Sequence, residues 1–149
     1  MAMELAALEI ARALGRDIPF ASHLGVRVKE KGGGRAVLQL ELRPELTNSY
    51  EAAHGGVVMT LLDIAMAVAA RTLDPTANGA ITVEMKASFI GTGQGMLLAE
   101  GRCLHLGRQI AFCEADVHDA KGKLIAKASG TFMLRHDRRG GVTAVPAKG

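Results

Sequence analysis

One stretch of this chain has the length of a helix but lacks a polar face. Residues 57–71 carry apolar side chains on nearly every side, and Asp63 is the one charged residue before Arg71. A helix that is apolar all round has to be buried by the rest of the fold. The run is also shorter than the roughly 20 residues that a membrane-spanning helix needs. We therefore expect a central helix enclosed by other elements.

The rest of the chain supplies strands for that enclosure. Apolar and polar residues alternate with the period of a β-strand over 35–42 and again over 80–90. Short turns separate the strand segments, so neighbouring strands should pair antiparallel. The pattern predicts an α+β fold, with a curved antiparallel sheet of five to six strands wrapped around one long buried helix. The expected strands are 25–30, 35–42, 80–90, 96–106, 109–118 and 123–134.

The domain organisation follows from length and local composition. A chain of 149 residues has room for one ordinary domain. Residues 3–14 have helical spacing, and two glutamates in this stretch favour an amphipathic helix over a secretory signal. We expect a cytoplasmic protein with an N-terminal helix and lead-in over 1–20, one domain over 21–135 and a flexible C-terminal tail over 136–149.

Composition narrows the range of partners. Aromatic residues make up 3% of the chain, with no tryptophan. The chain therefore has few of the aromatic side chains on which the bases of single-stranded nucleic acid stack. The net charge is +3, and the segment 136–149 holds three basic residues and one acidic residue, which leaves the body nearly neutral. Cys103 and Cys113 form neither a disulfide framework nor a metal-binding spacing. We expect no nucleic acid, no membrane and no metal.

Two features of the central helix suggest chemistry. A carboxylate such as Asp63 is expensive to bury without partners. It either faces a polar patch for structural reasons or acts as a general base or nucleophile on a rigid scaffold. The run His54-Gly55-Gly56 stands where the same helix should begin, and the first N–H groups of a helix have no internal partner. The glycines make either a tight entry turn or an oxyanion-type site that polarises a carbonyl.

The spacing of these two features limits how they can cooperate. Asp63 lies nine positions after His54, which is about 13 Å along one helix. One bound carbonyl is too small to touch both places, so if both act on it they come from two copies of the chain. Asn48 holds either a ligand or its own turn. Thr82 is, by itself, an ordinary residue of an alternating strand.

Together these residues resemble the pattern of a known family. From about residue 24 to residue 134, the chain is similar to hotdog-fold acyl-CoA thioesterases, particularly the branch of phenylacetate-degradation thioesterases. The resemblance rests on Asn48, the run 54–56 and Asp63 at their mutual offsets, followed by Ile-Thr-Val-Glu-Met at 81–85. The later stretches 107–116, 122–126 and 130–132 look like the closing strands of that family.

The resemblance implies a hotdog fold whose active sites lie where two subunits join their sheets edge to edge. By the family pattern, the Gly55 N–H polarises the thioester carbonyl, while His54 and Asn48 orient the thioester or the attacking water. Asp63 of the other subunit would be the general base or nucleophile, and Thr82 would assist it.

The resemblance also implies a substrate and an assembly. The expected reaction hydrolyses an acyl-CoA or aroyl-CoA to the free acid and CoA, with CoA as part of the substrate and no separate cofactor. Gly56 is expected to help bind the substrate, and Lys86 and Arg108 are either contacts for the CoA phosphates or ordinary surface charges. The expected partners are acyl-CoA and further copies of the chain, as a dimer or a dimer of dimers. Two alternatives stay open: a hotdog-fold hydratase or dehydratase of acyl thioesters, and a non-catalytic acyl-CoA binding module.

Overall fold

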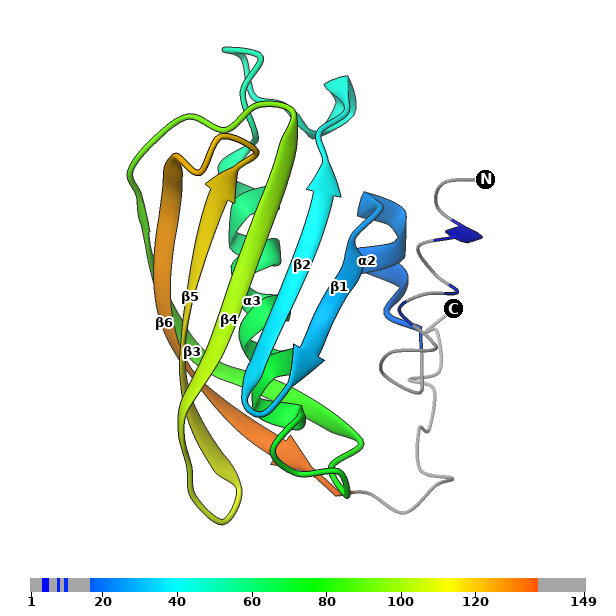
Figure 1. Cartoon of the computed structure of the whole chain (residues 1–149), viewed down its shortest axis with the longest axis vertical. Helices are drawn as coiled ribbons and strands as arrows, with labels where there is room; N and C mark the ends of the chain where they lie inside the picture. The colour runs from blue at the N-terminus through cyan, green and yellow to red at the C-terminus, as the bar shows by residue number, and fades with distance from the viewer. Residues whose placement is uncertain (1–3, 6–7, 9, 11–16, 137–149) are drawn as a thin grey trace, which may run out of the picture.

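One antiparallel sheet and one long helix make up most of the chain (Figure 1). The computed structural model describes residues 4, 5, 8, 10 and 17–136. The elements, in chain order, are helix α2 (Pro19–Leu24), strands β1 (Arg27–Gly32) and β2 (Arg35–Glu41), the short 3-10 helix η1 (Pro44–Leu46), helix α3 (Gly55–Arg71), and strands β3 (Gly79–Phe89), β4 (Met96–Leu106), β5 (Ile110–Asp119) and β6 (Leu124–Arg135).

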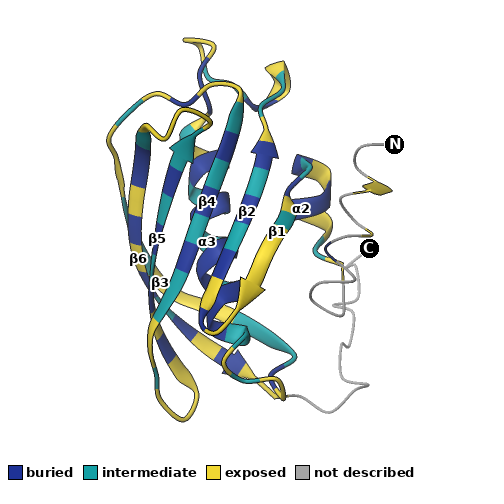
Figure 2. Cartoon of the chain, in the orientation of Figure 1, coloured by how far each residue is buried: buried dark blue, intermediate teal, exposed yellow. Residues whose placement is uncertain are grey.

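The six strands form a single sheet in the order β1-β2-β4-β5-β6-β3, and each neighbouring pair is antiparallel. The sheet curves around α3, which lies behind the strands in the view of Figure 1. Inward-facing residues alternate with outward-facing ones along the central strands, as the banding of β4 and β5 in Figure 2 shows. The predicted α+β fold is confirmed, with six strands.

Helix α3 is buried around most of its circumference but is open along one stripe. The half-buried residues recur at helical spacing, so they share one side of the helix. The sheet covers the other sides. Because the sheet leaves this stripe uncovered, Asp63 lies beside cavities on that side of the helix. Its members are Met59, Thr60, Asp63, Ala67 and Arg71.

Local rules account for where the elements begin and end. Helix α3 starts at Gly55, within the run 54–56 where the sequence indicated its beginning, and the His54 side chain caps it by accepting the Gly56 N–H. Helix α2 was not expected from the sequence, although Pro19 at its first turn and the left-handed Gly25 after its end are typical helix boundaries. The strand bounds differ from the expected ones by no more than two residues.

The chain ends are described only in part. Most of the helix expected over residues 3–14 lies outside the described residues, although positions 4, 5, 8 and 10 are helical. The tail beyond residue 136, which we expected to be flexible, lies outside them as well. The domain bounds at 21 and 135 therefore stay predictions. No helix in the part of the chain that the structure describes is long and apolar enough to cross a membrane.

The two edges of the sheet differ sharply in chemistry. Along β1, the exposed side chains include Arg27, Lys29 and Glu30. Along β3, the exposed side chains include Val83 and Phe89, which are 58% and 55% exposed, beside the charged Glu84 and Lys86. A charged edge resists pairing with another chain, whereas a long apolar edge invites it. The β3 edge therefore exposes larger apolar side chains than the β1 edge does.

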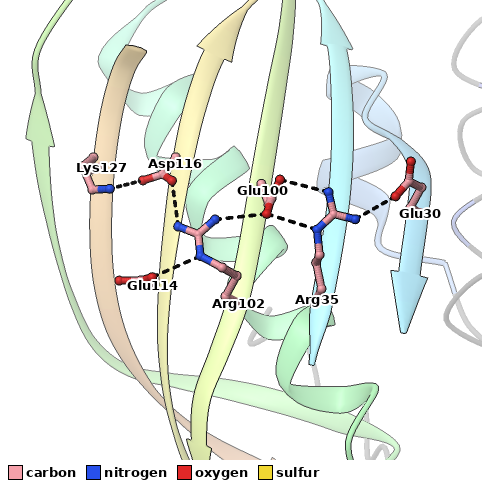
Figure 3. Close-up of polar contacts among 7 residues, drawn as sticks. All are labelled: Glu30, Arg35, Glu100, Arg102, Glu114, Asp116 and Lys127. Atoms are coloured by element: carbon pink, nitrogen blue, oxygen red, sulfur yellow. Dashed lines mark hydrogen bonds and ion pairs between the residues drawn. The ribbon is translucent and has the colours of Figure 1, made fainter. Parts of the chain in front are cut away.

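The outer face of the sheet carries an ion-pair network that crosses five strands (Figure 3). At its centre, the Arg102 guanidinium donates to Glu114 at 3.0 Å and to Asp116 at 2.7 Å. Hydrogen bonds from Arg35 lower the pKa of Glu100. Burial alone would raise the pKa of Asp116, but its bonds to Lys127 and Arg102 bring the net shift downward. The network ties the strands together, and its members are Glu30, Arg35, Glu100, Arg102, Glu114, Asp116 and Lys127.

The two cysteines are packed within the sheet as free thiols. Cys103 on β4 pairs directly with Cys113 on β5. Burial raises the pKa of Cys113 to about 12 and also raises the pKa of Cys103. Thiols that stay protonated at neutral pH are poor nucleophiles. The cysteines thus serve the packing of the sheet.

Candidate functional site

The carboxylate of Asp63 is held by a strand residue. Thr82 Oγ1 donates a hydrogen bond of 2.6 Å to Asp63 Oδ1. Thr82 lies on the inner side of β3, where it pairs with the buried Phe132 of β6. Among the described residues, this hydroxyl is the one hydrogen-bond partner that the carboxylate has.

Two cavities meet at Asp63. The first, which we call the C-terminal cavity, has a volume of about 300 Å³ and extends from Asp63 and Thr82 towards the end of α3. The second, the N-terminal cavity, has a volume of about 280 Å³ and extends towards the start of α3 past Met59, Thr60 and Met85. Ile18 lines both. A mostly apolar cavity with a few convergent polar groups is the usual form of a small-molecule site.

The beginning of α3 is shaped by His54 and its two glycines. His54 is exposed, and its Nδ1 accepts the Gly56 N–H at 2.9 Å. The Gly56 amide is thus engaged within its own loop, whereas Gly55, as the first helical residue, directs its N–H out of the helix. A side chain added at Gly55 would meet the ring of Phe89 at 3.6 Å. Phe89 therefore forms an apolar wall beside the Gly55 amide.

Asn48 holds its own turn. Its Oδ1 accepts the backbone N–H groups of Tyr50 at 2.9 Å and Ala52 at 3.2 Å. The same loop is closed by a bridge between Thr47 and Ala53, immediately before His54. Asn48 Oδ1 therefore supports the turn that sets the path of the chain into α3, and the expected contact of this side chain with a ligand stays a prediction.

Lys86 lies on the wrong face of the sheet for the cavities beside Asp63. Simple alternation along β3 places Lys86 on the same face as Thr82. However, a bulge between Thr82 and Glu84 adds one residue and reverses the alternation. Beyond the bulge, Met85 pairs with buried Gly130, and Lys86 pairs with exposed Ser129. Lys86 therefore faces away from the cavities beside Asp63 within one chain, and the expected contact with the CoA phosphates stays a prediction.

Arg108 is also remote from the start of α3. It lies in the turn between β4 and β5, which is closed by the bond from the Gly107 N–H to the Ile110 carbonyl at 2.8 Å. This turn is at the opposite end of the molecule from the loop that leads into α3 (Figure 1). Within a single chain, the structure therefore brings neither basic candidate to Gly55.

The two halves of the expected site are separated along one rigid helix. Gly55 and Asp63 are eight residues apart, which corresponds to about 12 Å of helix. The strand repeats this separation, because Phe89 packs near Gly55 while Thr82 binds Asp63. One chain therefore presents two half-sites that cannot act on the same carbonyl.

Several residues around the site were not singled out from the sequence. Arg71 lies on the same helical stripe as Asp63, and this spacing was a usable signal. Phe89 and Ile18 depend on tertiary packing, for which one sequence offers no signal.

No group of three histidine, cysteine, aspartate or glutamate side chains among the described residues is arranged to hold a metal ion.

Comparison with known proteins places this geometry in a family. Residues 50–126 match the model of the Thioesterase superfamily, a segment that runs from the loop before α3 into β6. The chain belongs to the thioesterase superfamily. A relative from Saccharolobus solfataricus, which carries only a provisional esterase name, is 34% identical over 112 residues, or 74% of this chain and 79% of the relative. The 1,4-dihydroxy-2-naphthoyl-CoA hydrolase of Listeria monocytogenes is 25% identical over 118 residues, or 78% of this chain and 95% of that protein.

Solved structures confirm the hotdog fold of this thioesterase-superfamily chain. The PaaI protein from the phenylacetic acid degradation operon of E. coli superposes with a TM-score of 0.76 over 89% of this chain and 96% of that one, at 21% identity. A Streptococcus mutans protein solved with bound acetyl-CoA superposes with a TM-score of 0.68 over 76% of this chain and 91% of that one, at 26% identity. The predicted resemblance to hotdog-fold thioesterases is confirmed.

Proposed function

We propose that this protein hydrolyses an acyl-CoA or aroyl-CoA to the free acid and CoA, at active sites that two subunits share. The observation that carries the proposal is the position of Asp63, which is bound to Thr82 beside two cavities and lies half a helix away from the Gly55 amide. A relative named as a naphthoyl-CoA hydrolase and a structural neighbour with bound acetyl-CoA support a CoA thioester as substrate.

The β3 edge offers a way to complete the site. Exposed apolar residues along this edge favour pairing with β3 of a second copy about a two-fold axis. An axis that crosses β3 between Met85 and Lys86 makes Thr82 of one subunit level with Phe89 of the other. Because Phe89 packs against Gly55 and Thr82 binds Asp63, this register brings the Gly55 half-site of one chain to the Asp63 half-site of its partner.

In this arrangement each group of the chain has its own role in the reaction. The Gly55 N–H, at the positive end of the α3 dipole, donates to the thioester oxygen and stabilises the charge that develops there. Asp63 of the other subunit takes a proton from water, whose oxygen forms the new bond to the carbonyl carbon. The C–S bond then breaks, and the proton moves from Asp63 to the departing CoA sulfur. The Nδ1 of His54 accepts the Gly56 N–H, so Nε2 is the ring nitrogen that orients the thioester or the attacking water.

The role of Asp63 is tested by Asp63→Asn. This substitution keeps the size of the side chain and removes the base, so kcat for thiol release from acyl-CoA should fall by roughly 10²–10⁴-fold. Thermal unfolding and circular dichroism establish that the variant is folded. Unchanged turnover would contradict the proposal, and so would modification of the acyl chain without release of thiol and free acid.

The role of the Gly55 amide is tested by a substitution that removes its N–H donor. Gly55→Pro eliminates the N–H, and proline is well accepted as the first residue of a helix. His54 has φ −62° and ψ 136°, which suits a residue before proline. We expect kcat to fall by roughly 10²–10³-fold. The matched control is Gly55→Ala, which keeps the N–H and meets Phe89 at an ordinary 3.6 Å; equal losses in both variants would contradict a role for the amide.

Mixing the two inactive variants tests whether the site is shared. In a heterodimer of Asp63→Asn with Gly55→Pro, one of the two sites has both groups intact. Random exchange in an equal mixture should therefore restore about a quarter of the wild-type activity. Exchange is verified with differently tagged subunits. Proven exchange without recovered activity would contradict the shared site.

The assembly itself is tested at the β3 edge. Val83→Lys places a charge on the exposed apolar edge and should shift the sedimenting species from dimer to monomer, with loss of activity. The control is Leu104→Lys on β4, because Leu104 is also highly exposed, at 62%, but does not lie on an edge strand. A Val83→Lys variant that still sediments as the wild type would contradict pairing through β3.

A further inference from the structure

One residue from outside helix α3 separates the two cavities beside Asp63. The residues that line both cavities are Ile18, Asp63 and Ile64. Asp63 and Ile64 belong to α3, whereas Ile18 immediately precedes α2. The Ile18 side chain therefore closes the boundary between the cavities from outside the helix. A β-branched side chain has few rotamers, so this wall is stiff.

The position of Ile18 is fixed through its backbone and through its side chain. The Ser22 N–H donates to the Ile18 carbonyl at 3.0 Å, and Ser22 Oγ donates to the carboxylate of the neighbouring Asp17. Ser22 is buried within α2. The side chain of Ile18 packs against the hydrophobic core. A ligand at Asp63 therefore meets a wall that is held in place.

The two cavities differ in the polarity of their linings. Besides Asp63, the C-terminal cavity is lined by the polar residues Arg71, Asn78 and Thr82. Among the described residues that line the N-terminal cavity, Thr60 is the one polar side chain besides Asp63, and its hydroxyl already donates to the Gly56 carbonyl at 2.8 Å. The rest of this lining is apolar: Ile18, Phe20, Met59, Ile64 and Met85. The N-terminal cavity is thus the better match for an apolar acyl group.

The boundary at Ile18 restricts the shape of that acyl group. A thioester carbonyl at Asp63 lies where the cavities meet, so a chain that enters the N-terminal cavity leaves a second branch at the α-carbon directed at Ile18. The cavity volume of about 280 Å³ corresponds to about nine heavy atoms, at roughly 30 Å³ each. We infer that the N-terminal cavity receives the acyl group and that Ile18 restricts it to an unbranched chain of up to about eight carbons. This inference rests on the proposed hydrolysis for the location of the thioester at Asp63.

The test compares two isomeric six-carbon thioesters, hexanoyl-CoA with one chain and 2-ethylbutanoyl-CoA with two. Because branching also changes the reactivity of the carbonyl, binding is measured, by calorimetry with the slow variant Asp63→Asn. We expect hexanoyl-CoA to bind about 10–100-fold more tightly, as is typical of methylene groups that a pocket cannot accommodate. Adding Ile18→Ala should bring the two affinities close together, and Ile18→Val, which removes one methyl group, should leave a smaller preference.

A further substitution identifies the cavity that the second branch enters. Ala67 lies on the open stripe of α3 and lines the C-terminal cavity. Ala67→Leu, added to Ile18→Ala, fills the space beyond the removed wall. It should weaken the binding of 2-ethylbutanoyl-CoA again and leave the affinity for hexanoyl-CoA unchanged. An equal loss for both thioesters would overturn the assignment of the acyl group to the N-terminal cavity.

The matched control is Ile110→Ala, the same change at a partly exposed residue on the outer face of β5, which should leave the preference unchanged. Equal binding of the two thioesters before any change at Ile18 would overturn the inference, and so would a preference that survives Ile18→Ala in a folded protein. Wild-type hydrolysis of hexanoyl-CoA is measured separately. Hydrolysis without the preference contradicts only the selection at Ile18, whereas the preference without hydrolysis supports the acyl site and contradicts the proposed reaction.

Discussion

The contact between Gly101 and helix α3 determines how precisely Asp63 is placed. A Cβ atom at Gly101 would lie 2.2 Å from the Ala65 carbonyl oxygen and 2.3 Å from its carbon. Contacts of 3.4 Å and above are ordinary for such an atom. In Gly101→Ala, the helix backbone would therefore have to retreat from β4 by about 1 Å, because neither partner is a flexible side chain that could swing aside.

The expected cost follows from this displacement. Overpacking of a core costs about 1–3 kcal/mol, and a clash with backbone belongs at the upper end, near 3 kcal/mol. At about 2–4 °C per kcal/mol for a chain of this size, the Tm should fall by roughly 6–12 °C. Ala65 is two residues from Asp63, so the shift also disturbs the 2.6 Å bond to Thr82. Misplacing a catalytic group by about 1 Å can lower kcat by on the order of 100-fold.

The measurement pairs calorimetric unfolding with thiol release. The matched control is Gly79→Ala at the start of β3, where the added atom would meet nothing closer than the Arg135 Cβ at 3.8 Å. The control should be at least as stable as the wild type, since glycine weakens a strand. If Gly101→Ala unfolds at the temperature of the control, the helix is not held at this contact, and the argument for a precisely placed Asp63 fails.

Other perturbations test the bond at Asp63 and the network on the outer face. Thr82→Val removes the hydroxyl that donates to Asp63, so kcat should fall about tenfold, whereas Thr82→Ser should retain most of the activity in the same thiol-release assay. Arg102→Met leaves Glu100, Glu114 and Asp116 without their shared partner and should lower the free energy of unfolding by about 1–2 kcal/mol. Because the pKa values of Glu100 and Asp116 are lowered in the folded state, their stabilisation is present at neutral pH and is lost as the pH falls below about 4. Urea unfolding at pH 7 and pH 3 should show this loss, and an equal loss in Arg102→Met would contradict the assignment to the network.

Much of the fold could be predicted because burial imposes a simple period on the sequence. The all-apolar run over 57–71 located α3, and alternation located the strands to within two residues. The turn between β1 and β2 falls between the expected strands 25–30 and 35–42, and its Gly33 and Gly34 adopt positive φ values of 58° and 80°. Helix α2 was missed because six residues are too few to show a helical period.

The site was harder to predict because it depends on register and on a bulge. Asp63 and Thr82 are 19 residues apart, and each has an ordinary interpretation when taken alone. Strand alternation grouped Thr82 with Lys86, but the bulge at Val83 places them on opposite faces. A single extra residue in a strand leaves no trace in composition. Asn48 was open between ligand and turn, and its part in the turn could be recognised only from the backbone N–H groups that its Oδ1 accepts.

The bulge also links the chemistry of the proposed site to its assembly. On the inner side it directs Thr82 towards Asp63, and at the edge it leaves Val83 exposed where a second chain would pair. Bulges commonly occur at sheet edges and beside active sites, where they redirect a side chain. A helix fixes Gly55 and Asp63 about 12 Å apart whatever the rest of the fold does. Under the proposed function, a second chain docked on the β3 edge brings its own Gly55 close to Asp63, so the strand that binds Asp63 also has to bind the partner.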